Sequence, residues 1–106
     1  MTSALRHILG QFRNGLQEIY GSRLAGLVLF GSQARGDGLP DSDIDVMIVL
    51  RGSVNPQQEI QRVSPLSSAL SLQNDVVISC VYMSEDDYRN ELSPLLLNVR
   101  REGVAV

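Results

Sequence analysis

Two aspartates near the middle of the chain, Asp43 and Asp45, are the residues whose type and spacing most directly indicate chemistry. They stand one residue apart at the start of an apolar run. If this run forms a β-strand, the spacing places both carboxylates on the same face. Two carboxylates that close repel each other, so we expect a cation between them. Because the ligands are oxygen atoms, the pair predicts a Mg²⁺ site that substrate phosphates complete.

A glycine and a serine upstream of the aspartates have the properties of a phosphate-binding turn. Gly31 follows a short β-favouring apolar run that ends at Phe30, and it allows the backbone to turn sharply there. With Ser32 and the amides that follow, Gly31 provides a cluster of N–H donors of the kind that binds phosphate. A divalent ion linking Asp43 and Asp45 to a triphosphate in this turn would be the arrangement used for phosphoryl and nucleotidyl transfer.

Together the turn and the carboxylate pair resemble the signature of the DNA polymerase β-like nucleotidyltransferases. Gly31 and Ser32 are followed by ten residues and then by the run Asp43-Ile44-Asp45. The fuller pattern, Gly-Ser-Gln-Ala-Arg-Gly-Asp followed by Ser-Asp-Ile-Asp-Val, is most similar to the minimal nucleotidyltransferase (MNT) branch. The resemblance extends over nearly the whole chain. It implies a nucleotidyltransferase fold, a Mg²⁺ cofactor and an NTP substrate, with ATP as the expected donor.

The resemblance also implies which residues bind the nucleotide. These are Gly31, Ser32, Arg35 and Gly36. In the resembled family the arginine at this position contacts the triphosphate, and we expect Arg35 to lie on a short helical turn after Ser32. The alternative for Arg35 is a surface ion pair with Asp37 or Asp41.

Three carboxylates are implied as catalytic and metal-binding residues. Asp43 and Asp45 are two of them, and Asp75 is the candidate for the third. Since Asp75 begins the next predicted strand, a parallel arrangement would bring it beside the pair. In the resembled enzymes such a residue helps to hold the metal and deprotonates the attacking hydroxyl. The alternative is that Val77 takes this position and that Asp75 lies solvated in a turn with Asn74.

The first half of the chain contains the elements that would position the turn and the pair. Apolar residues at helical spacing predict an amphipathic helix from residue 2 or 3 to Tyr20. Nearly unbroken apolar runs predict two strands, Leu24–Phe30 and Ile44–Leu50. The connection between them is only about a dozen residues long and Ser32 must lie near Asp43, so the simplest geometry is antiparallel.

The second half of the chain is predicted to return to the same sheet through a helix. Asn55 and Pro56 have the types expected at an N-cap and a first helical position, and the helix continues to about Leu72. Pro65 predicts either a kink or a division into two short helices. Because this helix is a crossover, the strand predicted over Asp75–Met83 runs parallel to the strand before it.

Two further helices complete the predicted fold, one with Ser84 as its N-cap and one that begins at Ser93-Pro94 and continues to Arg101. The fold class is α/β. We expect a nucleotidyltransferase fold with a small three-stranded mixed sheet, in which strand 1 is antiparallel to strand 2 and strand 3 is parallel to strand 2. About four helices flank this sheet. Residues 1–106 are expected to form a single minimal nucleotidyltransferase domain.

Composition narrows the classes of function. The 106 residues are 43% hydrophobic and 20% charged, which is typical of one small globular domain. A net charge of −3 argues against non-specific nucleic-acid binding, which requires a basic surface. The lone cysteine, Cys80, excludes an intramolecular disulfide. No apolar stretch reaches membrane-spanning length, so we expect a cytoplasmic protein.

The acceptor of the transferred group is the least determined part of the hypothesis. The chain is too short to add a second domain that would shape an acceptor pocket, so we expect a partner protein to supply the acceptor. MNT proteins typically pair with a HEPN-domain toxin, which they neutralise by complex formation or by adenylylation, so the resemblance implies a HEPN-type partner. Two alternatives stay open. One is a binding or antitoxin subunit that has lost turnover, and the other is an aminoglycoside-type nucleotidyltransferase that would need a homodimer to complete its pocket.

Overall fold

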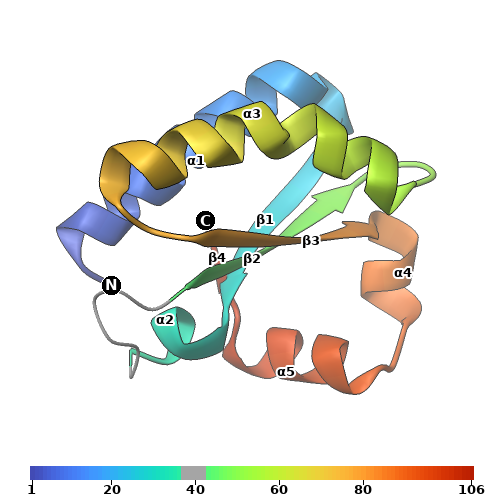
Figure 1. Cartoon of the computed structure of the whole chain (residues 1–106). Helices are drawn as coiled ribbons and strands as arrows, with labels where there is room; N and C mark the ends of the chain where they lie inside the picture. The colour runs from blue at the N-terminus through green and yellow to red at the C-terminus, as the bar shows by residue number, and fades with distance from the viewer. Residues whose placement is uncertain (37–42) are drawn as a thin grey trace.

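The structure, a computed structural model, describes residues 1–36 and 43–106 and contains one mixed β-sheet (Figure 1). Its strands are β1 Leu24–Phe30, β2 Ile44–Leu50, β3 Ile78–Ser84 and β4 Val104–Ala105. They lie in the order β3-β2-β1-β4. β1 is antiparallel to β2 and to β4, whereas β2 is parallel to β3. The predicted topology of the first three strands is confirmed, and β4 is an additional edge strand.

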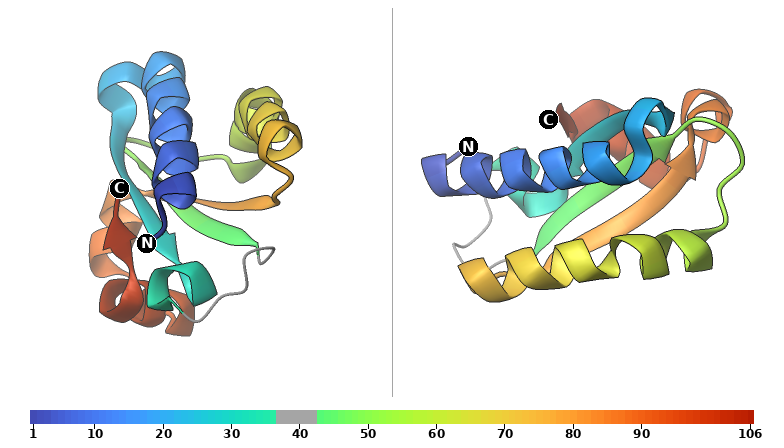
Figure 2. Two further views of the ribbon diagram at one scale, coloured as in Figure 1. Left: turned by 90° about the vertical axis from the view of Figure 1, so that its left-hand side faces the viewer. Right: turned by 90° about the horizontal axis from the view of Figure 1, so that it is seen from above.

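Helices cover both faces of this sheet. The helices are α1 Ser3–Tyr20, α2 Gly31–Arg35, α3 Pro56–Asn74, α4 Glu85–Asn90 and α5 Pro94–Glu102. A short 3₁₀ turn, Gly21–Arg23, connects α1 to β1. Figure 2 shows α1 and α3 running alongside each other over one face, while α4 and α5 lie on the opposite face. The described residues thus contain five α-helices where about four were expected, because the helical turn predicted after β1 is long enough to form α2.

The central strand β2 divides the apolar interior into two cores. Ile44 and Val46 pack on the side of α1 and α3. Met47 and Val49 pack on the opposite side, against residues of α5. Because side chains alternate along a strand, Asp45 belongs to the same face as Met47 and Val49. The apolar pattern of β2 therefore directs the aspartate away from the core that α1 covers.

The two long helices begin at side-chain caps. The Thr2 hydroxyl accepts a hydrogen bond from the Leu5 N–H at 3.1 Å, and Asn55 caps α3 in the same way. α3 is one helix with Pro65 inside it, so of the two predicted alternatives, a kink or a division into two helices, the division is wrong. Pro65 is exposed, which lets water solvate the carbonyl that the proline leaves unpaired. Within residues 1–36 and 43–106, none of the helices has the length and apolar character needed to cross a bilayer.

The third strand begins later than the sequence predicts. β3 begins at Ile78 and not at Asp75, because α3 continues to Asn74 and Asp75 forms its C-cap. Asp75 adopts a left-handed backbone with φ 52° and ψ 49°, which reverses the chain direction at that point. At the other edge of the sheet, Val104 of β4 pairs with Leu29 of β1. A strand of two residues is too short to produce a periodic pattern, which explains why the sequence did not predict it.

Candidate active site

The antiparallel pairing of β1 and β2 brings the Gly-Ser turn against the carboxylate pair. Phe30, the last residue of β1, is the register partner of Asp45 near the start of β2. A Cβ atom added to Gly31 would lie 2.5 Å from Asp45 Oδ2. The side chain of Asp45 therefore lies directly beside Gly31, and a larger residue at this position would displace the carboxylate.

The turn itself is the beginning of α2. Gly31 has φ +75° and is the first residue of the helix, and Ser32 is the second. At the other end Gly36 has φ +80°, and its N–H donates to the Ser32 carbonyl at 3.0 Å. The first N–H groups of a helix have no partner within it, so those of Gly31 and Ser32 are the candidate donors for an anion. They lie next to Asp45, at the positive end of the helix.

The carboxylate pair carries an electrostatic penalty. Partial burial raises the pKa of the Asp45 carboxyl above its usual value, and the negative charge of Asp43 raises it further. A bound cation would offset both effects because it favours the ionised form. The donor set consists of two carboxylates beside the candidate phosphate-binding turn, and its chemistry fits Mg²⁺. Asp43 and Asp45 are thus the residues in position to hold this ion.

Asp75 does not join this pair. In the parallel register Ile44 lies opposite Ile78, and the Ile44 N–H donates to the Val77 carbonyl at 2.8 Å. Val77 is therefore the residue level with Asp43, while Asp75 lies before the strand at the cap of α3. Among the residues described, no group of three or more His, Cys, Asp or Glu side chains is placed to hold a metal ion. The expectation that a parallel strand would bring Asp75 beside the pair is wrong, because the strand begins three residues too late.

Arg35 is connected to the C-terminal helix. Its Nη1 donates to Oε2 of Glu102 at 3.1 Å, across a sequence separation of 67 residues. The two helices that carry these residues, α2 and α5, lie near each other below the sheet (Figure 1). The alternative partners Asp37 and Asp41 lie outside the described residues. Nothing in the sequence near either residue indicates the contact with Glu102, which depends on the tertiary fold.

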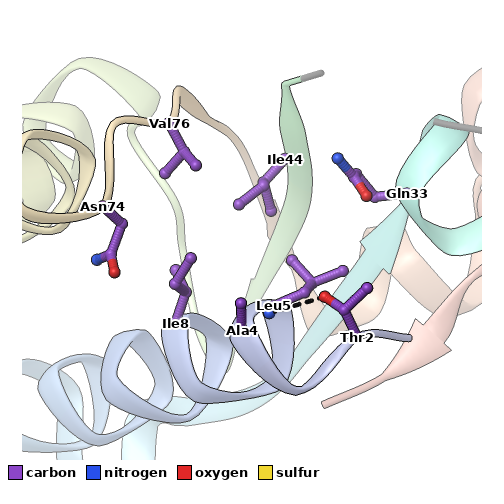
Figure 3. Close-up of a pocket in the computed structure, with 8 residues that line it drawn as sticks. All are labelled: Thr2, Ala4, Leu5, Ile8, Gln33, Ile44, Asn74 and Val76. Carbon is purple, nitrogen blue, oxygen red and sulfur yellow. Dashed lines mark hydrogen bonds between the residues drawn. The ribbon is translucent and has the colours of Figure 1, made fainter. Parts of the chain in front are cut away.

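A cavity of about 420 Å³ opens at the same end of β2, on the side of α1 (Figure 3). Its lining residues are Thr2, Ala4, Leu5, Ile8, Gln33, Ile44, Asn74 and Val76. Ile44 separates Asp43 from Asp45 in the sequence and points the opposite way, so the cavity and the pair lie on opposite faces of β2. No pattern in the sequence indicates this cavity, because its lining comes from four distant segments.

Known proteins are similar to this chain over the range that contains the turn and the carboxylate pair. The family described as Nucleotidyltransferase domain matches residues 9–95, a range that includes both Gly31-Ser32 and the aspartates. The chain belongs to this family. A candidate protein adenylyltransferase of Methanocaldococcus jannaschii is 36% identical to this nucleotidyltransferase over 94 residues, which is 88% of each chain. The family and this relative show that the chain is a nucleotidyltransferase.

Solved structures share the fold of this nucleotidyltransferase at lower sequence identity. A toxin–antitoxin structure with AMP-PNP superposes with a TM-score of 0.63 at 22% identity, covering 89% of this chain and 68% of the other. A complex of tri-AMPylated Shewanella oneidensis HEPN toxin with MNT antitoxin gives a TM-score of 0.52 at 18% identity, covering 89% and 67%. At these identities the likeness establishes the nucleotidyltransferase fold.

Proposed function

We propose that this nucleotidyltransferase transfers an adenylyl group from ATP to a hydroxyl of a HEPN-type protein partner, with Mg²⁺ held by Asp43 and Asp45. The observation that carries the proposal is the contact between Gly31 and Asp45, which joins the phosphate-binding turn and the carboxylate pair into one site. The Methanocaldococcus jannaschii relative supports a protein as the acceptor. The neighbours with AMP-PNP and with an AMPylated HEPN toxin support ATP as the donor and a HEPN protein as the partner.

Different residues of the site bind the phosphates and the metal in the proposed reaction. The N–H groups of Gly31 and Ser32, with Gly36 ending the short helix, bind phosphate oxygens, and the Arg35 guanidinium binds the triphosphate. Asp43 and Asp45 hold the metal at the junction with β2. When bound, Mg²⁺ neutralises charge that develops on the phosphates as pyrophosphate leaves. The acceptor oxygen forms a bond to the α-phosphorus as the bond to pyrophosphate breaks, and the proton of the acceptor hydroxyl passes to water.

The proposal extends to the setting in which the protein works. Residues 1–36 and 43–106 share one sheet with a core on each face, which supports a single minimal nucleotidyltransferase domain. We place its action in the cytoplasm, where ATP is available. A sequence pI near 4.9 supports a protein partner in preference to non-specific nucleic acid.

A label-transfer experiment tests this function. The protein is co-expressed with the product of the neighbouring gene and incubated with Mg²⁺ and ATP labelled at the α-phosphate. We expect label on the partner with the wild-type protein and none with Asp43→Asn. Asp86→Asn, on the exposed surface of α4, is the control for a loss of one negative charge and should transfer normally. Equal label with Asp43→Asn would refute the assignment of the pair.

A second candidate function is that of an MNT-fold antitoxin subunit that binds its partner without turnover. The position of Asp75 favours it, since the described residues supply two carboxylates to the site and not three. The same experiment separates the two functions. Stable binding of the partner by the wild-type protein, with no label transferred at any ATP concentration, would establish the non-catalytic subunit.

A further inference from the structure

We propose that the outer edge of β3 is an interaction surface at which two copies of this chain join their sheets. In the part of the chain that the structure describes, β3 lies at the end of the sheet with β2 as its one neighbour (Figure 1). Every residue from Ile78 to Ser84 is partly exposed, whereas β2 is almost entirely buried. An edge strand of this length presents backbone groups that another strand can bind.

The hydrogen bonds to β2 determine which backbone groups of β3 face outward. The Ile44 N–H donates to the Val77 carbonyl at 2.8 Å, and Ile44 lies opposite Ile78. In a parallel ladder only alternate residues bond to a given neighbour, so Val77 and the odd-numbered residues of β3 face β2. The even-numbered residues therefore direct their N–H and C=O groups away from the sheet, and they are Ile78, Cys80, Tyr82 and Ser84.

This edge has none of the features that usually prevent strands from pairing. Its sequence, Ile-Ser-Cys-Val-Tyr-Met-Ser, contains no charged residue, proline or glycine. Its ladder with β2 runs from Ile78 to Ser84 without a bulge. Edge strands that stay unpaired are commonly interrupted by such features or are very short. The opposite edge of the sheet follows this rule, because β4 has only two residues.

The order of side chains in β3 fits a second copy of the same strand. An antiparallel pairing about a two-fold axis at Val81 uses the whole strand and brings the outward-facing residues of the two copies together. Each larger side chain then lies opposite a smaller one: Tyr82 opposite Cys80, Met83 opposite Ser79 and Ile78 opposite Ser84. Since the strand is uncharged, the pairing of identical copies brings no like charges together.

The surface beside this edge is uncharged as well. A groove of about 180 Å³ lies between α3 and β3, and its lining residues are Ile60, Ser64, Ser67, Ile78, Cys80 and Tyr82. Ile60 is apolar and yet 52% exposed. In the two-fold pairing, Tyr82 of the second copy lies beside Cys80 at this groove, so the two copies cover apolar surface of each other. The two carboxylate pairs lie at opposite ends of the joined strands, and the dimer does not depend on the proposed catalysis.

Proline at position 80 tests the pairing, because it removes an outward N–H and leaves the bonds to β2 intact. In sedimentation equilibrium the wild-type protein should have about twice the monomer mass of 11.6 kDa. Cys80→Pro should weaken the dimer by roughly 10- to 100-fold, because the two-fold axis repeats the loss of a hydrogen bond in both copies. Cys80→Ala loses the thiol but keeps the N–H and should remain dimeric. Circular dichroism checks that both variants are folded.

Cross-linking tests the register. In a Cys80→Ala background, Val81→Cys places two thiols opposite each other at a Cα separation of about 4.5 Å, which a disulfide can span. Met83→Cys is the matched control, since Met83 is also partly exposed and lies on the same face of β3. Its two copies are about 13 Å apart along the joined strands. Mild oxidation should give a covalent dimer with Val81→Cys and none with Met83→Cys.

Each of the other outcomes would overturn part of the proposal. A wild-type protein that stays monomeric at a concentration on the order of 100 μM would refute the dimer, and equal dimerisation of Cys80→Pro and Cys80→Ala would refute the role of the edge. Efficient cross-linking of Met83→Cys would refute the register. If the wild type were monomeric and bound a HEPN-type partner that Cys80→Pro alone failed to bind, the edge would pair with that partner and not with a second copy.

Discussion

Replacing Gly31 by alanine is the most direct perturbation of the site, because it acts on the contact between the turn and the carboxylate pair. Gly31 has φ +75°, and an alanine there adopts a left-handed backbone at a cost of about 1–2 kcal/mol. The new Cβ atom would also lie 2.5 Å from Asp45 Oδ2, well inside van der Waals contact. The carboxylate must move away, and a displacement of about 1 Å in a reacting site can reduce the rate about 100-fold.

The expected result therefore has two parts, a moderate loss of stability and a large loss of activity. For a domain of this size, about 1–2 kcal/mol lowers the thermal midpoint by roughly 4–16 °C. Label transfer to the partner should fall by about two orders of magnitude at a temperature where the variant remains folded. Circular dichroism melts and the label-transfer assay measure the two quantities on the same preparation.

Gly52→Ala is the matched control for this experiment. Gly52 follows β2 with φ +85°, and an added Cβ atom would meet nothing within 4 Å. This variant should show a similar loss of stability, since the backbone strain is the same, and should keep its activity. If the two alanine variants lost activity equally, or if Gly31→Ala stayed active, the contact between Gly31 and Asp45 would not be important for catalysis.

Three further predictions follow from individual side chains. Asp45→Asn should raise the thermal midpoint of the metal-free protein near neutral pH. Folding raises the pKa of Asp45, so its ionised form destabilises the fold at pH values above the folded pKa. This penalty disappears as the pH falls through the folded pKa. The thermal midpoints of the wild type and the variant should therefore converge in acid. Asp75→Asn, at a backbone conformation that asparagine tolerates, should keep label transfer within about threefold, whereas Asp43→Asn abolishes it. Glu59→Ala should lower the free energy of unfolding, measured with urea, by about 1–3 kcal/mol. Glu59 is 2% exposed, and its Oε1 accepts a hydrogen bond from the Tyr20 hydroxyl at 2.7 Å. The substitution leaves this buried hydroxyl without its acceptor.

The parts of the fold that the sequence predicted are those with strong local signals. The bounds of β1 and β2 agree with the apolar runs, and α1 begins after its cap and ends at Tyr20 as its spacing indicates. The contact between the Gly-Ser turn and the pair also followed from the sequence, since a short connection between two strands leaves few geometries. Local patterns were sufficient wherever the neighbours in space were also near in sequence.

The parts that the sequence did not predict depend on contacts between distant segments or on ambiguous boundaries. The end of α3 carries no glycine stop signal, so its extension to Asn74 and the left-handed cap at Asp75 were not visible in the residue pattern. That difference of a few residues moves Asp75 out of register with the pair. The contact between Arg35 and Glu102 spans 67 residues, and only the packing of α5 under the sheet brings them together.

The same strand that supplies the core also determines the chemistry of the site. A one-residue slip of β2 would turn Ile44 outward and bury Asp45 in the core under α1, so the apolar run that follows fixes the direction of both carboxylates. Their position at the beginning of the strand leaves Asp45 only partly buried, and this burial raises the pKa of its carboxyl. The negative charge of Asp43 adds to the pKa shift of Asp45, so in the proposed function a bound cation would relieve the repulsion between the two carboxylates. Part of the affinity for the proposed metal would then come from this electrostatic strain, which the packing of β2 maintains.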